Sequence, residues 1–107
     1  MGFYLIQVGY TVGAENALVD HPQNREEAAR KAIKSVGGKM HSFHFAFGEY
    51  DVVIVAEMPN NVAAAAVAMA TTARGALSKF HTTTLLTSEE GMEAMKMAKK
   101  VTYAPQA

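Results

Sequence analysis

Apolar and polar residues alternate with two different periods along the chain, and the changes of period mark its strands and helices. The segment from Phe3 to Thr11 is rich in aromatic and β-branched residues without a helical period, which predicts a strand. Residues 39–47 (KMHSFHFAF) alternate with a period of two, and residues 51–58 (DVVIVAEM) form an apolar run. The intervening GEY predicts a tight turn, so these two runs predict a hairpin. Residues 78–87 (SKFHTTTLLT) predict a fourth strand.

Helical patterns occupy the first part of the chain between these strands. Residues 12–20 predict a weak helical turn that ends at His21 and Pro22. Asn24 and Glu27 have the spacing of a capping box and open an amphipathic helix over residues 25–36. Gly37 and Gly38 then supply a left-handed stop.

Two further helices follow the hairpin. Asn60 or Asn61 caps an alanine-rich helix through residues 62–74, which Gly75 ends. Thr87 and Glu90 form a second capping box on a short terminal helix. Met92 and Met95 of that helix could bind a neighbour, although methionines at helical spacing usually belong to a core.

The resulting order is strand, helix, strand, strand, helix, strand, followed by a terminal helix. This is the split βαβ arrangement of a ferredoxin-like α+β domain. We therefore expect one domain over residues 1–100 and a tail over residues 101–107. Both main helices should cover one face of a four-stranded antiparallel sheet, which leaves the other face open.

Neither face of this sheet is polar enough to stand in water. Strict alternation in residues 39–47 places His41 with Phe43, Phe45 and Phe47, and it places Met40 on the other face with Ser42, His44 and Ala46. We expect the Phe43 side to share the helix-facing core with Val52, Ile54 and Ala56. The other face would then carry Val53, Val55 and Glu57, with either Leu5, Gln7 and Gly9 or Tyr4, Ile6, Val8 and Tyr10 from the first strand. A contiguous apolar patch usually marks an interface, so we expect a homo-oligomer that stacks sheet on sheet, with a small-ligand cavity between the sheets.

Composition narrows the choice of partners. The 107 residues include ten basic and ten acidic side chains, scattered along a chain of zero net charge, which argues against nucleic acid and membrane surfaces. Cysteine is absent, which excludes disulfides and thiolate metal ligands. The segment MGFYLIQVGY has no charged n-region and soon reaches Gln7, so we expect no signal peptide or spanning helix and a cytoplasmic location.

The chain resembles the GYD-domain family of small bacterial and archaeal proteins. The resemblance rests on Phe47-Gly48-Glu49-Tyr50-Asp51 before an apolar strand, then Glu57, Pro59 and an alanine-rich helix, and finally Gly75 and the run Thr82-Thr83-Thr84. It implies a ferredoxin-like domain of the dimeric α/β barrel kind, without an established biochemical role. A structural account of the signature has Gly48 permitting the turn, Asp51 bonding turn amides and Tyr50 packing on the hairpin.

Candidate chemistry is sparse, and no nucleotide, cofactor or metal motif stands out. His41 and His44, three apart on a strand, should point to opposite faces. A metal site would need His44 with Glu57 and a third ligand such as His81, whereas a hydrogen-bonded histidine near an interface is the favoured interpretation. The candidate ligand-binding residues are His44, Glu57, Gln7, Tyr50 and Asp51.

Two functions remain open from the sequence, and with them the question of whether the chain is an enzyme. The first is a homo-oligomeric module that binds a small, partly apolar ligand or acts through protein contacts. The alternative is a cofactor-independent oxygenase or isomerase, with His44 as acid or base and Glu57 or Gln7 orienting the substrate.

Overall fold

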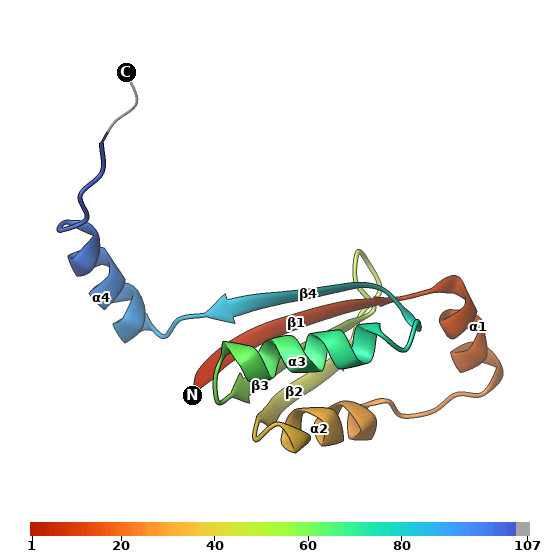
Figure 1. Ribbon diagram of the computed structural model, residues 1–107. Coiled ribbons are helices and arrows are strands. Elements are labelled where there is room, and N and C mark those ends of the chain that lie inside the picture. Colours follow the sequence, from red (N-terminus) through yellow and green to blue (C-terminus); the bar gives the residue numbers. More distant parts are fainter. Residues whose placement is uncertain (105–107) are drawn as a thin grey trace.

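Four antiparallel strands form one sheet in the order β2-β3-β1-β4, so the first and third strands lie at its centre (Figure 1). The computed structural model describes residues 1–104. The strands are β1 (Gly2–Tyr10), β2 (Lys39–Phe45), β3 (Val52–Met58) and β4 (Leu77–Leu85). Each was predicted from the hydrophobic pattern to within about two residues, the usual uncertainty of an element's boundary.

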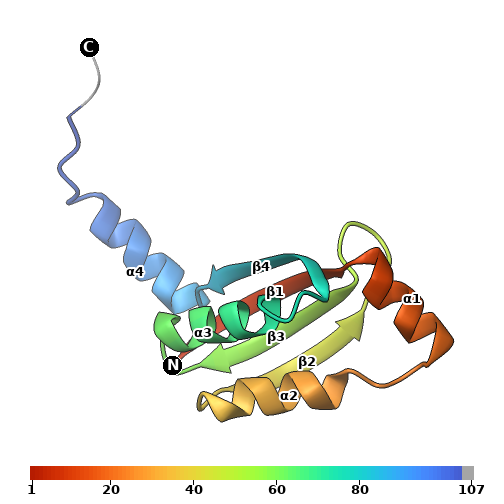
Figure 2. The same ribbon diagram turned by 45° about the vertical axis from the view of Figure 1, so that its right-hand side comes forward.

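Two of the helices cover one face of this sheet. They are α2 (Glu26–Ser35) and α3 (Asn61–Thr72), which lie on the same side of the sheet in Figures 1 and 2. A third helix, α1 (Val12–Asp20), lies at the end of the sheet where β1 ends, and α4 (Ser88–Ala98) lies beyond the opposite end. The element order confirms the predicted ferredoxin-like α+β fold.

The helix ends follow the predicted signals in most places. The Asn60 side chain accepts a hydrogen bond from Ala63 N at 2.9 Å and caps α3. Gly37 and Gly75 have φ angles of 83° and 81°, the left-handed conformation that ends α2 and α3. The predicted capping box at Asn24 is wrong, because α2 begins one residue later and the Asn24 side chain accepts from Glu26 N at 2.9 Å instead.

The core lies between the sheet and these two helices. Its strand residues alternate strictly, with Tyr4, Ile6 and Val8 from β1 buried against Val52, Ile54, Ala56 and Met58 from β3. Ile33 from α2 and Val67 from α3 complete it from the helix side. The first strand therefore gives Leu5, Gln7 and Gly9 to the other face, which settles the alternative left open by the sequence.

The predicted alternation of β2 is wrong at its start because the strand contains a β-bulge. Met40 pairs with Ala56 but Ser42 pairs with the adjacent Val55, so His41 is an extra residue in the ladder. Met40 is consequently buried on the same side as Phe43, and His41 points to the opposite face together with Ser42 and His44. His41 and His44 thus share a face, contrary to the expectation from strict alternation.

The connection between β2 and β3 is longer than the predicted tight turn. It runs over residues 46–51, and Ala46 N donates to the carbonyl oxygen of Asp51 at 2.8 Å near its base. Gly48 within it does not adopt a positive φ angle. The fold therefore does not need a glycine there on conformational grounds.

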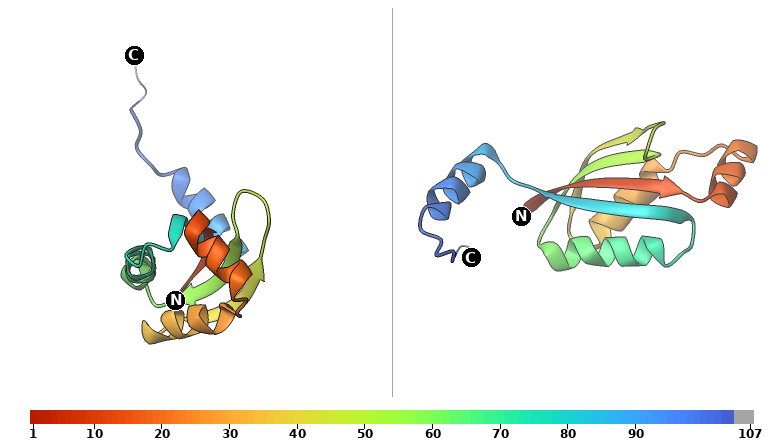
Figure 3. Two further views of the ribbon diagram at one scale, coloured as in Figure 1. Left: turned by 90° about the vertical axis from the view of Figure 1, so that its right-hand side faces the viewer. Right: turned by 90° about the horizontal axis from the view of Figure 1, so that it is seen from above.

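The terminal helix α4 stands away from the rest of the molecule (Figures 1 and 3). Thr87 and Glu90 form the predicted capping box at its start. Met92 and Met95 are 58% and 72% exposed, so neither belongs to the core. Residues 101–104 have no regular structure, and the rest of the predicted tail, residues 105–107, lies outside the described residues.

Candidate functional site

The face of the sheet turned away from α2 and α3 carries most of the candidate residues, and we call it the open face. No helix of residues 1–104 covers it, as the end view in Figure 3 shows. Its members come from all four strands: Phe3, Leu5 and Gln7; His41, Ser42 and His44; Val53, Val55 and Glu57; and Lys79, His81, Thr83 and Leu85. Apolar and polar side chains are therefore mixed on this face.

A histidine and a carboxylate meet near one end of the open face. His41 Nε2 lies 3.1 Å from Oε1 of Glu57, and the two side chains are 35% and 25% exposed. The His41 ring also packs beside Phe3, with ring centroids 5.2 Å apart. The bulge in β2 creates this contact, because it turns His41 onto the face that holds Glu57.

The middle of the open face holds a row of residues that crosses the whole sheet. Cross-strand pairing places four residues in this row, in the order His44, Val53, Gln7 and His81. Strands lie about 4.8 Å apart, so the two histidines at its ends are about 14 Å apart. Glu57 lies four residues from Val53 along β3, about 13 Å away.

These separations argue against a metal site formed by His44, Glu57 and His81 of one chain. His44, His81 and Glu57 of one chain are too far apart to ligate one ion, since metal ligands lie about 2 Å from the metal. Within residues 1–104, no group of three or more histidine or acidic side chains has a metal-binding arrangement.

Asp51 and Tyr50 hold the hairpin connection against neighbouring strands. Asp51 Oδ2 accepts from Tyr10 N at 2.8 Å, and Asp51 N donates to the Val8 carbonyl oxygen at 2.8 Å. The Tyr50 ring stacks on His81, and Lys79 Nζ lies 4.8 Å from the Tyr50 centroid. Their structural roles therefore differ from those expected: Asp51 bonds the end of β1 instead of turn amides, and Tyr50 packs on β4 instead of the hairpin. A ligand role for either residue stays a prediction.

The candidate catalytic residues share the open face but do not converge. Gln7 and His44 flank Val53 in one row, and Glu57 is engaged with His41 at another. None of the three lines either of the two cavities described below. The role of acid, base or orienting group assigned to them stays a prediction without supporting geometry.

A cavity of about 700 Å³ lies on the opposite side of the sheet, between the strands and helices α2 and α3. Tyr10, Arg25 and Arg74 are among its lining residues. Burial raises the pKa of the Tyr10 hydroxyl, Arg25 acts in the opposite direction, and the carboxylates of Asp51 and Glu15 add to the increase. Sequence reasoning did not single out Tyr10, Arg25 or Arg74, because they form no motif.

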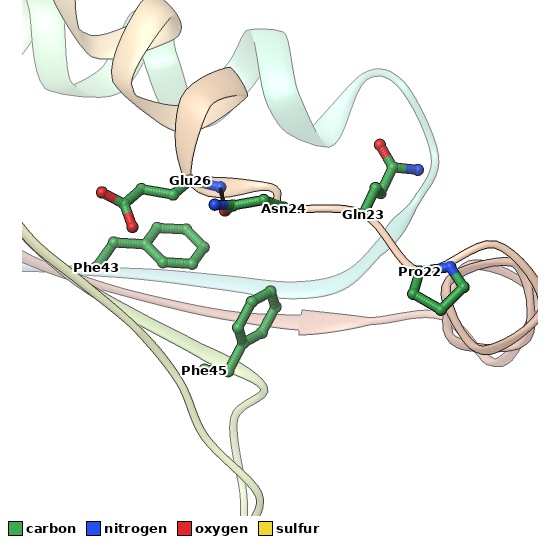
Figure 4. Close-up of a pocket in the computed structure, with 6 residues that line it drawn as sticks. All are labelled: Pro22, Gln23, Asn24, Glu26, Phe43 and Phe45. Atoms are coloured by element: carbon green, nitrogen blue, oxygen red, sulfur yellow. Dashed lines mark hydrogen bonds between the residues drawn. The ribbon is translucent and has the colours of Figure 1, made fainter.

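A shallow groove of about 530 Å³ adjoins this cavity at the start of α2 (Figure 4). Phe43 and Phe45 of β2 line one side, with ring centroids 5.3 Å apart in an edge-to-face arrangement. The segment before α2 lines the other side with Pro22, Gln23 and Asn24, together with Glu26, the first residue of α2. Gln23 and Phe43 line both the groove and the cavity, so the two spaces are neighbours.

Comparison with known proteins identifies a family and no characterised relative. The family model of the GYD domain matches residues 4–95 of the chain. No curated protein and no solved structure matches it significantly. Of the helices within residues 1–104, none combines the length and hydrophobicity needed to cross a bilayer.

Proposed function

The chain belongs to the GYD-domain family, and because the matched region contains nearly the whole sheet, we propose that this domain functions through its open face. In this proposal the protein is a homo-oligomer whose subunits pack open face against open face. The polar side chains in the middle of that face then line a small-ligand site between the two sheets. The partly exposed apolar side chains of the two central strands on this face are the observation that carries the proposal.

On the open face, the two central strands are too apolar for the solvated side of an antiparallel sheet. Such a face should be polar, yet the central strands present Leu5, Val53 and Val55 there, each partly exposed. Phe3 and Leu85 extend the apolar surface toward one end. Covering apolar area gains about 25 cal/mol per Å², so a partner that excludes water from these side chains would stabilise the domain.

The terminal helix provides a second apolar surface that the chain does not cover. Every side chain of α4 is exposed, among them those of Met92, Met95 and Met97. The radius of gyration is 17.1 Å, against about 13 Å for a compact domain of roughly this length, because α4 extends beyond the sheet. A helix in this position can contact a neighbouring chain more readily than the sheet of its own chain.

A second copy of the chain is the partner that suits both surfaces. Most soluble oligomers are symmetric, and a two-fold axis brings the same patch of both chains together. The chain has zero net charge, so no long-range repulsion opposes the approach of two copies. One symmetric contact of the open faces would cover both sheets, and α4 of each chain could then contact the other.

The polar residues in the middle row support a ligand between the sheets. Once a second sheet covers the open face, Gln7, His44 and His81 lose water and need other hydrogen-bond partners. A small molecule with polar groups and an apolar body would satisfy these side chains and fill the space beside Val53 and Val55. Tyr50 and Asp51 would then lie at the rim of this site, near the end of the sheet.

Sedimentation equilibrium at micromolar concentration tests the self-association. We expect the unmodified chain to be a dimer or larger, and Val55→Lys to be monomeric, because the substitution places a charge in the centre of the interface. Val62→Lys makes the same change on the outer side of α3, where Val62 is 77% exposed, and should leave the oligomer intact. A monomeric unmodified chain, or an oligomeric Val55→Lys variant, would contradict the proposal.

Native mass spectrometry of untagged protein tests the ligand part separately. A bound molecule would appear as a mass excess over the subunits that disappears on denaturation. The excess should be lost from the Val55→Lys monomer and kept in Val62→Lys. If the oligomer carries no excess mass when purified from cells under mild conditions, the ligand part fails while the self-association stands.

A further inference from the structure

The cavity under the helices has an apolar floor made by the two central strands and the edge strands next to them. Ile6 and Val8 of β1, Ile54 of β3 and Phe80 of β4 line it from below. Its volume of about 700 Å³ lies within the range of roughly 300–1,000 Å³ found for small-molecule sites.

Small side chains on the two covering helices account for the space. Helix α2 presents Ala28, Ala29 and Ala32 to the cavity, and α3 presents Ala70. Because α2 packs on β2 and α3 packs chiefly on β4, the helices cover opposite halves of the sheet. Their alanines are too short to meet above the central strands, and the cavity is the volume between them.

Two arginines line one end of the cavity, whereas the nearby carboxylates of Asp51 and Glu15 are not among its lining residues. Arg25 immediately precedes α2, Arg74 follows α3, and both line the cavity near the end of β1 at Tyr10. No aspartate or glutamate is among the lining residues. Within residues 1–104 neither arginine forms an ion pair, and the only side-chain hydrogen bond of Arg25 there is to Gln23 Oε1 at 3.0 Å.

Two further polar groups at this end are already oriented by the fold. Tyr10 N donates to Asp51 Oδ2, which fixes the end of β1 beside the cavity. The Thr71 hydroxyl donates to the Val67 carbonyl oxygen at 2.7 Å, so it is occupied within α3. The Tyr10 hydroxyl, the Gln23 side-chain amide and the two guanidinium groups therefore remain as side-chain hydrogen-bond donors of the cavity.

We propose that this cavity binds an amphipathic carboxylate, whose acyl chain or ring lies over Ile6 and Ile54 and whose carboxylate lies between Arg25 and Arg74. Guanidinium groups match carboxylates in geometry and charge, and the apolar floor accommodates a body without polar groups. The groove lined by Phe43 and Phe45 adjoins the cavity and forms its approach from solvent. This site is on the other side of the sheet from the open face and does not depend on self-association.

Isoleucine methyl groups report on this cavity selectively. The chain has three isoleucines, Ile6, Ile33 and Ile54, and all three line the cavity. We expect decanoate to shift all three methyl resonances saturably in NMR spectra of the full-length chain. Decanol, which has the same chain length without a charge, should bind at least about tenfold more weakly.

Substitution of the two arginines separates charge recognition from apolar binding. The double variant Arg25→Gln/Arg74→Gln should bind decanoate at least about tenfold more weakly and bind decanol as before. The matched control Lys31→Gln/Lys99→Gln removes two positive charges that do not line the cavity and should leave decanoate affinity unchanged. Both arginines are exposed, so their replacement should not impair folding.

If a larger side chain fills the cavity, neither decanoate nor decanol should bind. Ala32→Phe places a ring in the space and should abolish the isoleucine shifts, whereas Ala65→Phe on the exposed side of α3 should preserve them. The proposal is overturned if decanoate leaves the isoleucine methyl groups unmoved or shifts only Val53 and Val55 on the open face. It is equally overturned if the double arginine variant binds decanoate as tightly as the unmodified chain.

Discussion

His41 Nε2 lies 3.1 Å from Oε1 of Glu57, so His41 is on the same face of the sheet as the next residue of its strand, Ser42. Two consecutive residues of a regular strand would point to opposite faces. The bulge in β2 removes this alternation at one place, which lets Met40 and Phe43 both face the core while His41 reaches Glu57. The contact is therefore a consequence of one extra residue.

Deletion of His41 should be tolerated by the fold, because it restores the regular ladder. Met40, Phe43 and Phe45 then keep the core side and Ser42 keeps the open side. We expect a loss of at most about 1 kcal/mol in the free energy of unfolding, the value of a partly exposed side-chain hydrogen bond and its packing. Deletion of Phe43 is the matched control, since it moves Ser42 toward the core and should cost about 3 kcal/mol or more.

Urea unfolding followed by circular dichroism measures both deletions in the Val55→Lys background, where association does not enter the free energy. An equal loss of stability from the two deletions would show that the bulge itself supports the fold.

A comparison of β2 with β3 shows which structural features the sequence pattern can predict and which it cannot. Grouping Val52, Ile54 and Ala56 with Phe43 predicted the buried face of β3 correctly, because the side chains of a regular strand alternate between its two faces even where the sequence is apolar throughout. The bulge left no such signal, since His41 and Ser42 are both polar and either could be the extra residue. The position of Glu57 was recognised from the sequence, but its partner was not.

The helix-side cavity could not be predicted for a different reason. Its volume depends on how far apart α2 and α3 lie, which is set by their packing on β2 and β4 and not by their own periodicity. Arg25 and Arg74 lie 49 residues apart in the sequence, at the ends of two different helices. Only the fold brings them to the same end of one cavity.

Two helix caps should differ in their effect on the stability of the domain. Asn60→Ala removes the cap of α3, which packs on the sheet, and should lower the free energy of unfolding by about 1 kcal/mol. Thr87→Ala removes the capping box of α4, whose side chains are all exposed. In the monomeric background this second change should reduce the helicity of α4 and leave the global unfolding midpoint unchanged.

Amide hydrogen exchange of residues 88–98, together with urea unfolding, distinguishes local from global effects. A similar fall in the unfolding midpoint for both cap variants would mean that α4 packs on its own domain in solution.

Two glycines with equally open surroundings should respond differently to alanine. A Cβ atom at Gly48 or Gly75 would meet nothing within 4 Å, but only Gly75 has a positive φ angle, 81°. Gly75→Ala should therefore cost about 1 kcal/mol, because a side chain disfavours the left-handed conformation. Gly48→Ala should be neutral or stabilise the domain by up to about 1 kcal/mol, since it restricts the unfolded chain.

Thermal and urea unfolding of the two variants measure this difference. A loss at Gly48 as large as that at Gly75 would contradict a purely conformational account of the connection.

Tyr10 should make the stability of the domain depend on alkaline pH. Its pKa is raised from the ordinary value of about 10, chiefly by burial, so the folded chain keeps the phenolic proton at a pH where the unfolded chain loses it. The unfolded state then binds fewer protons than the folded state, and the free energy of unfolding falls as the pH increases above about 10. Tyr10→Phe has no proton to lose, so its stability should fall less steeply than that of the unmodified chain between about pH 9 and 11.

Urea unfolding at closely spaced pH values gives the slopes of stability against pH for the unmodified chain and for Tyr10→Phe. The control is Tyr103→Phe, at a tyrosine that is 77% exposed, which should retain the slope of the unmodified chain. Parallel slopes for the unmodified chain and Tyr10→Phe would show that the Tyr10 hydroxyl is as accessible to solvent in the folded state as in the unfolded one.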